Sequence, residues 1–258
     1  MPADTALSPD YLAFSLWSYE GLIKHFCQQR SFLNTYCLLF SRAIILFLSV
    51  DCSSMKFDLQ KRLWHKFWAY FWYPKIYVRA KILAPYLAKF LQKKSTILDI
   101  GGGQGILSLV LARLLQAEVV NTDIVDYSTK GVPFVLSKKD KLPFNDKSFD
   151  YSLLIDVLHH CPAPEALLKE AKRVTRSQIV ILENNISARA VGNKKDLHWL
   201  MDAVQSVIFG IPLPRSIPVK YWQSLLKREG FVVTKEEDTS GKLPLINQHL
   251  FVIKTDLH

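Results

Sequence analysis

A glycine-rich stretch at residues 97–105, ILDIGGGQG, places an acid two residues ahead of four closely spaced glycines. The acid is Asp99, and the glycines are Gly101, Gly102, Gly103 and Gly105. Glycine lets the backbone turn sharply and approach a ligand, because it has no Cβ that would clash. An apolar pattern of helical period follows, and the N-terminus of a helix attracts negative groups. Because Asp99 would repel a pyrophosphate there, it favours a ligand with a cationic end.

A second acid, Asp123, directly follows the next apolar run, residues 118–122. A carboxylate at the end of the second strand of such a unit can accept hydrogen bonds from both hydroxyls of a ribose. This placement suits NAD as well as other nucleoside cofactors, so Asp99 decides between them. The two acids together predict a nucleoside cofactor with a cationic amino acid end, as in S-adenosylmethionine, and disfavour an NAD-dependent dehydrogenase.

These side chains need a framework that brings the ends of several strands together. Apolar runs predict strands over residues 96–100, 118–122, 134–137, 151–155 and 178–183, and helical periodicity predicts helices over 105–116, 163–174, 197–209 and 218–229. Alternating strands and helices predict an α/β, Rossmann-like, doubly wound and mostly parallel sheet of about seven strands. Residues 231–234 and 250–254 read as a final antiparallel hairpin, and further helices are expected in the N-terminal part. Ligands of such sheets bind beyond the carboxyl ends of the strands, where both acids are expected.

Several segments, in this order, resemble class I S-adenosylmethionine-dependent methyltransferases of the small type 11-like family, related to quinone and sterol methylating enzymes. ILDIGGGQG resembles the cofactor glycine motif, VVNTDIVDY the second-strand acid, and QIVILEN the fifth strand. The block DKLPFNDKSFDYSLLIDVLHHCPAPEALLKEAKRV resembles the fourth strand and the helix after it. The resemblance covers about residues 94–254 and is closest to uncharacterised bacterial members with a shortened second crossover. It implies S-adenosylmethionine as cofactor and methyl transfer by SN2 displacement.

The resemblance also implies roles for individual residues. Asp99 and the glycines of residues 101–105 would hold the methionyl end of the cofactor, and Asp123 the ribose. Ile124 would flank the adenine. Asp156 follows the fourth strand, near the expected position of the sulfonium methyl, and is assigned to the cofactor site as well.

Two departures from the family pattern affect the adenine side of the site. Where relatives often carry an Asp four residues before the Leu of the LPF motif, this chain has Lys138, with Asp140 two residues further on. Either Asp140 substitutes, or the backbone mainly holds the adenine. The segment between Asp123 and Phe134 is also too short for a full crossover helix. Both departures favour the alternative of a degenerate, non-catalytic protein that only binds S-adenosylmethionine.

The histidine pair of the LHH segment, His159 and His160, supplies the candidates for a catalytic base. A base is needed only where the acceptor must lose a proton, as in O-methylation or ring C-methylation. His160 is predicted as the better placed of the two, because imidazole titrates near neutral pH. The alternative is that both histidines only cap and pack the following segment.

The acceptor is predicted from residues 184–231, where these enzymes build a substrate lid. Four large apolar residues mark this region, Trp199, Met201, Phe209 and Trp222. They suggest a small, hydrophobic acceptor, lipid- or quinone-like, although core packing explains each residue singly.

Positive charge is concentrated ahead of the glycine motif. The formal net charge is +10, and residues 55–100 hold ten Lys and Arg against two acids. Aromatic residues interleave with these bases, so residues 56–94 can contact an anionic membrane surface, fold over the active site, or form a solvated face. An RNA methyltransferase is a further alternative, but no recognisable RNA-binding motif and no Asn/Asp-Pro-Pro-Tyr motif are present, which disfavours nucleic acid as a partner.

Three segments are therefore predicted: a hydrophobic extension over residues 1–54, a basic aromatic helical cap over 55–94, and a methyltransferase domain over 95–258. Residues 32–50 are mostly apolar, with Arg42 near their middle. They read as a buried or membrane-lying helix, as a marginal anchor, or as sequence ahead of a true start at Met55. The four cysteines show no CxxC pair, which predicts reduced thiols, no metal site and a cytoplasmic protein, with a peripheral position at the inner membrane face as the alternative.

Overall fold

The computed structural model describes residues 73–74, 76–126, 128, 131–138, 141–184, 206, 211–215, 217–239 and 248–255. The chain divides into two compact units, Met1–Leu59 and Gln60–His258, and every described residue belongs to the second. The predicted extension over residues 1–54, the start of the predicted cap, and most of the predicted helix over 197–209 lie outside the described residues. Within the part that is described, no helix is long and apolar enough to cross a membrane.

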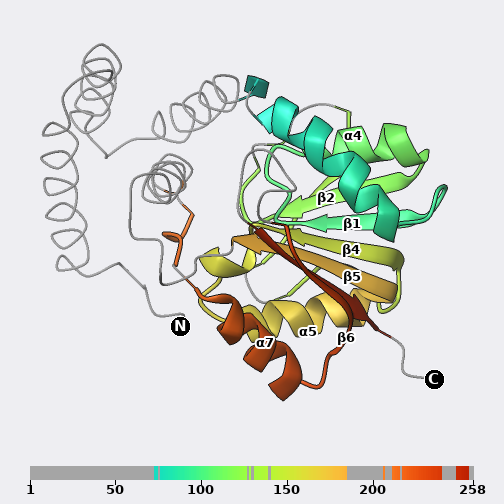
Figure 1. Ribbon diagram of the computed structural model, residues 1–258. Helices are drawn as coiled ribbons and strands as arrows, with labels where there is room; N and C mark the ends of the chain where they lie inside the picture. Colours follow the sequence, from blue (N-terminus) through green and yellow to red (C-terminus); the bar gives the residue numbers. More distant parts are fainter. Residues whose placement is uncertain are drawn as a thin grey trace, which may run out of the picture. The chain divides into compact units, whose positions relative to one another are not determined.

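One mixed sheet organises the second unit, with the strand order β3-β2-β1-β4-β5-β7-β6 (Figure 1). The strands are β1 (Thr96–Ile100), β2 (Glu118–Asp123), β3 (Phe134–Leu136), β4 (Phe149–Ile155), β5 (Thr175–Asn184), β6 (Val232–Asp238) and β7 (Gln248–Lys254). The first five strands run parallel, and β7 runs antiparallel to both β5 and β6. The order reverses between β1 and β4, so a ligand crevice is expected at the carboxyl ends of these two strands.

The predicted α/β, doubly wound fold with its final antiparallel pair is thus confirmed. The predicted helices over 105–116, 163–174 and 218–229 are α4 (Ile106–Leu115), α5 (Pro164–Val174) and α7 (Val219–Arg228). The last two strands extend further than their apolar runs predicted. The extensions pair with each other, Asp238 against His249, and the ladder of hydrogen bonds carries strand structure beyond the apolar residues.

Helices cover both faces of the sheet. On one face, α4 and a helix over residues 76–87, which is followed by the short turn η1 (Ala88–Phe90), pack against β1, β4 and β5. On the other face, α5 and α7 form the second core (Figure 1). The central strands read as nearly continuous apolar runs because both of their faces are buried. Trp222, predicted as part of an apolar lid, is 2% exposed and belongs to this second core.

The connection from β2 to β3 is short, and its described residues form turns. The sequence predicted that this segment is too short for a full crossover helix. Among the described residues of this connection, none belongs to a helix.

Two leucines of α4 provide a matched test of this packing. Leu111 is 0% exposed and lies in the core under the sheet, whereas Leu114 is 45% exposed on the same helix. We expect Leu111→Ala to lower the free energy of unfolding by about 2–5 kcal/mol, because it removes buried methyl groups and leaves a cavity. Leu114→Ala should change it by no more than about 0.5 kcal/mol. Urea titrations followed by circular dichroism measure both, and equal losses would contradict the assigned packing of α4.

Candidate functional site

The glycine loop joins the end of β1 to the start of α4. Gly101, Gly103 and Gly105 have φ angles of +70°, +56° and +72°, in the left-handed region that favours glycine. Gly101 donates its N–H to the carbonyl of Thr122 at 2.7 Å, which ties the loop to the end of β2. The loop therefore lies across the carboxyl ends of two adjacent parallel strands, as the sequence predicted for a ligand-binding turn.

The loop rests on a buried asparagine that the sequence analysis did not single out. Asn121 of β2 is 1% exposed, and its Nδ2 donates to the carbonyl oxygen of Gly103 at 3.0 Å. A Cβ placed on Gly102 would lie 2.4 Å from Asn121 Oδ1 and 2.6 Å from Asp99 Oδ2. Gly102 is thus required for close approach to these two side chains. The available signal was a polar residue inside the apolar run VVNTD.

Asp99 lies beneath the loop, 1% exposed, and accepts a hydrogen bond from Ser108 Oγ of α4 at 2.5 Å. Burial raises the pKa of Asp99 to about 6; the Ser108 hydrogen bond acts to lower it, and the nearby charge of Asp123 acts to raise it. Its carboxylate supports the loop from below. The predicted role of Asp99 toward the methionyl end of a cofactor stays a prediction, and from this position the side chain would act through its charge.

Asp123 ends β2 and fastens the upper part of the loop. Its Oδ2 accepts the Gly103 N–H at 3.0 Å, and its Oδ1 accepts the N–H of Ile124 at 2.6 Å. A carboxylate has about four lone-pair sites, so Asp123 has the capacity to accept ribose hydroxyls in addition. Ile124 is half-buried beside it. The structure thereby brings the predicted residues Asp99, Asp123 and Ile124 to the same loop.

These residues fit the charge of S-adenosylmethionine. Two carboxylates lie directly at the loop, and Asn121 Oδ1 is a buried acceptor with no hydrogen bond among the described residues. Such a set attracts a cationic group and repels a pyrophosphate. Lys138, at the family position of an adenine-binding acid, forms an isolated bridge with Lys141, and Asp140 lies outside the described residues.

Asp156 follows β4 with a φ of +55°, a strained conformation for a residue other than glycine. Its carboxylate accepts hydrogen bonds from the guanidinium of Arg79 and, at 2.7 Å, from Gln248 Nε2. The residues that bind it come from the helix over 76–87 and from β7, so three segments far apart in sequence meet here. Its predicted place at the cofactor stays a prediction, and sequence reasoning missed both of its partners because neither lies in a motif.

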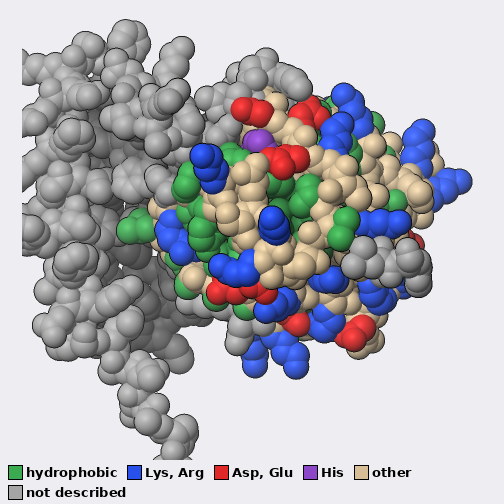
Figure 2. Space-filling view, turned by 60° about the horizontal axis from the view of Figure 1, so that its bottom comes forward, with side chains coloured by type: hydrophobic (Ala, Val, Ile, Leu, Met, Phe, Trp, Pro, Cys, Tyr) green, Lys and Arg blue, Asp and Glu red, His purple; other side chains and the backbone are tan. Residues whose placement is uncertain are grey.

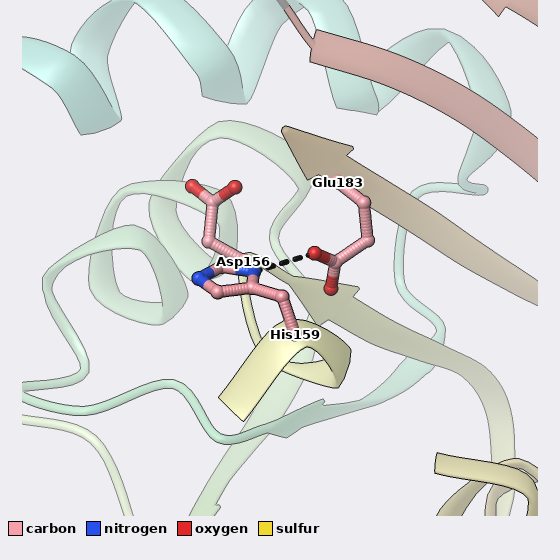
Figure 3. Close-up of side chains that lie close together, drawn as sticks. All are labelled: Asp156, His159 and Glu183. Atoms are coloured by element: carbon pink, nitrogen blue, oxygen red, sulfur yellow. Dashed lines mark hydrogen bonds and ion pairs between the residues drawn. The ribbon is translucent and has the colours of Figure 1, made fainter. Parts of the chain in front are cut away.

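The two histidines of the LHH segment have different partners. His160 Nδ1 lies 2.8 Å from the carbonyl oxygen of Pro212, whereas His159 Nδ1 lies 2.6 Å from Glu183 Oε2 (Figure 3). Glu183, near the end of β5, is 1% exposed, and His159 is 4% exposed. This geometry does not test the prediction that His160 is the better placed base. It does show that His159, and not His160, is paired with a buried acid.

Asp156, His159 and Glu183 form a cluster in which one ligand-type atom of each lies within 4.8 Å of those of the others (Figure 3). Clusters of this composition can hold a metal ion. Here the oxygens of both acids already have partners. Those of Asp156 accept hydrogen bonds from Arg79 and Gln248, while Glu183 Oε1 accepts two backbone N–H groups and its Oε2 contacts His159 Nδ1.

Comparison with known proteins places these features in context. Residues 98–182 match the family model of a methyltransferase domain. An uncharacterized protein of Methanocaldococcus jannaschii is 28% identical over 79 residues, which cover 31% of this chain and 38% of that protein. The chain therefore matches little more than a third of the length of that curated relative.

Solved structures share the fold at low sequence identity. A SAM-dependent methyltransferase from Aquifex aeolicus gives a TM-score of 0.51 at 19% identity, covering 67% of this chain and 88% of that one. A SAM-dependent methyltransferase from Methanosarcina mazei gives 0.51 at 19% identity, with 67% and 98% covered. The [4+2]-cyclase SpnF gives 0.54 at 14% identity, with 68% and 81% covered.

The buried carboxyl of Asp99 predicts a pH dependence of stability. Its pKa is about 6 in the folded protein and 3.8 as the ordinary value, so between these values the folded state binds more protons than the unfolded state. This residue therefore makes the protein less stable as pH rises from about 4 to about 6. In the ligand-free protein, we expect Asp99→Asn to remove that loss. The free energy of unfolding of the variant minus that of wild type should therefore rise by up to about 3 kcal/mol between pH 4 and pH 7.

Urea denaturation of both proteins across this pH range measures the difference, in which the contributions of all other groups cancel. Parallel curves for wild type and Asp99→Asn would contradict the assigned environment of the carboxyl.

Proposed function

We propose that this chain, in which residues 98–182 match the family model of a methyltransferase domain, transfers a methyl group from S-adenosylmethionine to a small, hydrophobic acceptor. The observation that carries the proposal is the glycine loop held between Asp99, Asn121 and Asp123 at the switch point of the sheet. The resemblance drawn from the sequence motifs is confirmed by the domain match over residues 98–182.

In the proposed reaction the protein mainly binds, orients and excludes water. Asp123 would accept hydrogen bonds from the ribose of S-adenosylmethionine, the backbone of the glycine loop would hold its methionyl part, and the charge of Asp99 would favour its ammonium group. When bound, S-adenosylmethionine supplies the methyl group and a positively charged sulfur as leaving group. Asp156, held by Arg79 and Gln248, would line the edge of the site on the side of the cofactor and acceptor.

A hydrophobic acceptor, lipid- or quinone-like, is supported by the apolar side chains around this edge. The two methyl groups of Val157 would lie 2.6 and 2.8 Å from a Cβ placed on Gly101, so Val157 borders the loop. The segment over residues 211–215 is fastened nearby, because His160 contacts Pro212 and the Arg215 N–H donates to the His159 carbonyl at 3.1 Å. Leu213 in that segment is 56% exposed.

Contact with a membrane surface through residues 56–94 is part of the proposal and would bring the protein to a lipid-soluble acceptor. The described helix over 76–87 uses its apolar side, including Leu83 and Leu87, in the core of the sheet. Its opposite side carries the exposed Val78, and Lys81 lies over the ring of Tyr77. Membrane contact would therefore rest mainly on the aromatic residues before position 73.

Two alternatives were open from the sequence, and the structure bears on them differently. A protein that binds the cofactor without methyl transfer is suggested by Lys138 and by the short connection from β2 to β3. An RNA methyltransferase was motivated by positive charge. On the face that bears α5 and α7, however, Lys and Arg side chains are spread among acidic and hydrophobic ones (Figure 2). Lys169 pairs with Glu229, and Arg173 with Asp146 and Glu170.

Calorimetric titration with S-adenosylmethionine tests the proposal. We expect wild type to bind and Asp123→Ala to lose at least about tenfold in affinity, because the ribose and the Gly103 N–H lose a shared acceptor. Asp126→Ala is the matched control, since this acid is exposed and accepts hydrogen bonds only from nearby Ser128 among the described contacts. Absence of binding to the wild type would refute the proposal, and full affinity in Asp123→Ala would refute the assigned site.

A further inference from the structure

A buried histidine–glutamate pair stands at the carboxyl ends of β4 and β5, beside the glycine loop. His159 lies in the short turn η2 (Leu158–His160), directly after β4, and Glu183 lies one residue before the end of β5. Val157, two residues before His159, borders Gly101 of the loop. The pair therefore lies at the carboxyl ends of two central strands, close to the glycine loop, and the proposed function assigns it no task.

The surroundings of Glu183 fix its orientation. Its Oε1 accepts the backbone N–H groups of Val157 and Leu158 at 3.0 and 2.7 Å, and its Oε2 contacts His159 Nδ1 at 2.6 Å. A carboxylate with its oxygens turned toward three nitrogens acts as acceptor for all of them. This predicts that the imidazole carries its proton on Nδ1.

Fixing the proton on Nδ1 determines what the rest of the ring can do. In a neutral imidazole with Nδ1 protonated, Nε2 holds the lone pair and is the nitrogen that accepts a proton. The carboxylate on the opposite side then stabilises the imidazolium that forms, which is the logic of acid–histidine pairs in proton-transfer catalysis. Asp156 adds a second carboxylate, with an oxygen within 4.8 Å of a ligand-type atom of His159 and of Glu183 (Figure 3).

The same three side chains could be considered as a metal site, but their existing partners oppose it. A divalent cation would compete with the Arg79 guanidinium and Gln248 for the oxygens of Asp156, and with backbone N–H groups and His159 for those of Glu183. A guanidinium next to the site would also repel the cation. The contacts therefore favour proton transfer over metal binding.

We propose that His159 is the general base of the methyl transfer, that Glu183 is its positioning residue, and that the acceptor carries an ionisable hydroxyl, phenolic or enolic. This inference rests on the proposed function and deepens it. In the step, a bond forms between the acceptor oxygen and the methyl carbon, and the bond between that carbon and sulfur breaks, with its electron pair remaining on sulfur. The hydroxyl proton passes to His159 Nε2, which later releases it to solvent.

The imidazole tautomer can be measured on the full-length protein without any acceptor. We expect two-bond ¹⁵N–¹H correlation spectra at pH 8 to show His159 protonated on Nδ1. In Glu183→Gln the side-chain oxygen can still accept the two backbone N–H groups, while its amide faces Nδ1 and donates to it. The proton should therefore move to Nε2. Protonation of wild-type His159 on Nε2 would overturn the proposal, as would loss of the Nδ1–H signal on adding Mg²⁺ or Zn²⁺, which would favour a metal site.

Activity is then measured with two small aromatic probes, 2-naphthol, which must lose a proton, and N,N-dimethylbenzylamine, which has none to lose. We expect labelled methyl to appear on naphthol oxygen. His159→Gln should lower kcat by about 10²–10⁴-fold with an unchanged Kd for S-adenosylmethionine. Glu183→Gln should also lower kcat, while KM and the Kd for S-adenosylmethionine stay unchanged. A merely structural defect would alter these two constants as well.

His160→Gln is the matched comparison on the adjacent residue. We expect the loss of kcat in His159→Gln to exceed the loss in His160→Gln by at least about tenfold. A larger loss in His160→Gln, transfer to the amine in place of the naphthol, or transfer to neither probe by a protein that binds the cofactor would overturn the inference. A wild type that fails to bind S-adenosylmethionine would instead refute the proposed function itself.

Discussion

The close approach of the glycine loop to buried polar side chains is the constraint on which the site depends. Gly102 leaves no room for a Cβ above Asn121 and Asp99, and both side chains are 1% exposed. Keeping a carboxyl in that place costs free energy, which the raised pKa of Asp99 reflects and the Ser108 hydrogen bond partly offsets. The polar layer that shapes the loop therefore also places negative charge beside it, which is the feature on which the proposed binding of a cationic cofactor rests.

A second set of contacts joins segments that the sheet alone would leave separate. Asp156, with its left-handed backbone, binds Arg79 from the helix over 76–87 and Gln248 from β7. The basic segment ahead of the domain thus contributes a side chain to the edge of the crevice. Its contribution is an ion pair at this edge together with core packing against the sheet.

Most of the framework could be predicted from the sequence, because buried parallel strands and amphipathic helices have strong periodic signatures. The glycine motif and Asp123 were found for the same reason: the chemistry sits within a few residues of a strand end. Asn121 gave the signal of a polar residue inside an apolar run, but Glu183 and Gln248 could not be found in this way. Their importance depends on which strands are neighbours and in which register, and those facts are not encoded within a short window. The choice between His159 and His160 has the same difficulty, since only the position of β5 decides which ring meets Glu183.

The arrangement divides the chemistry of the site between two neighbouring regions. The loop between β1 and α4, with the end of β2, carries carboxylates and backbone N–H groups suited to a cationic nucleoside cofactor. The ends of β4 and β5 carry an imidazole and acids suited to moving a proton. The methyltransferase and the [4+2]-cyclase among the solved structures share the fold with this chain, and a fold by itself does not determine a reaction. In the proposed reaction, the acceptor side is assigned to the second region, where His159 and Glu183 would select acceptors that lose a proton.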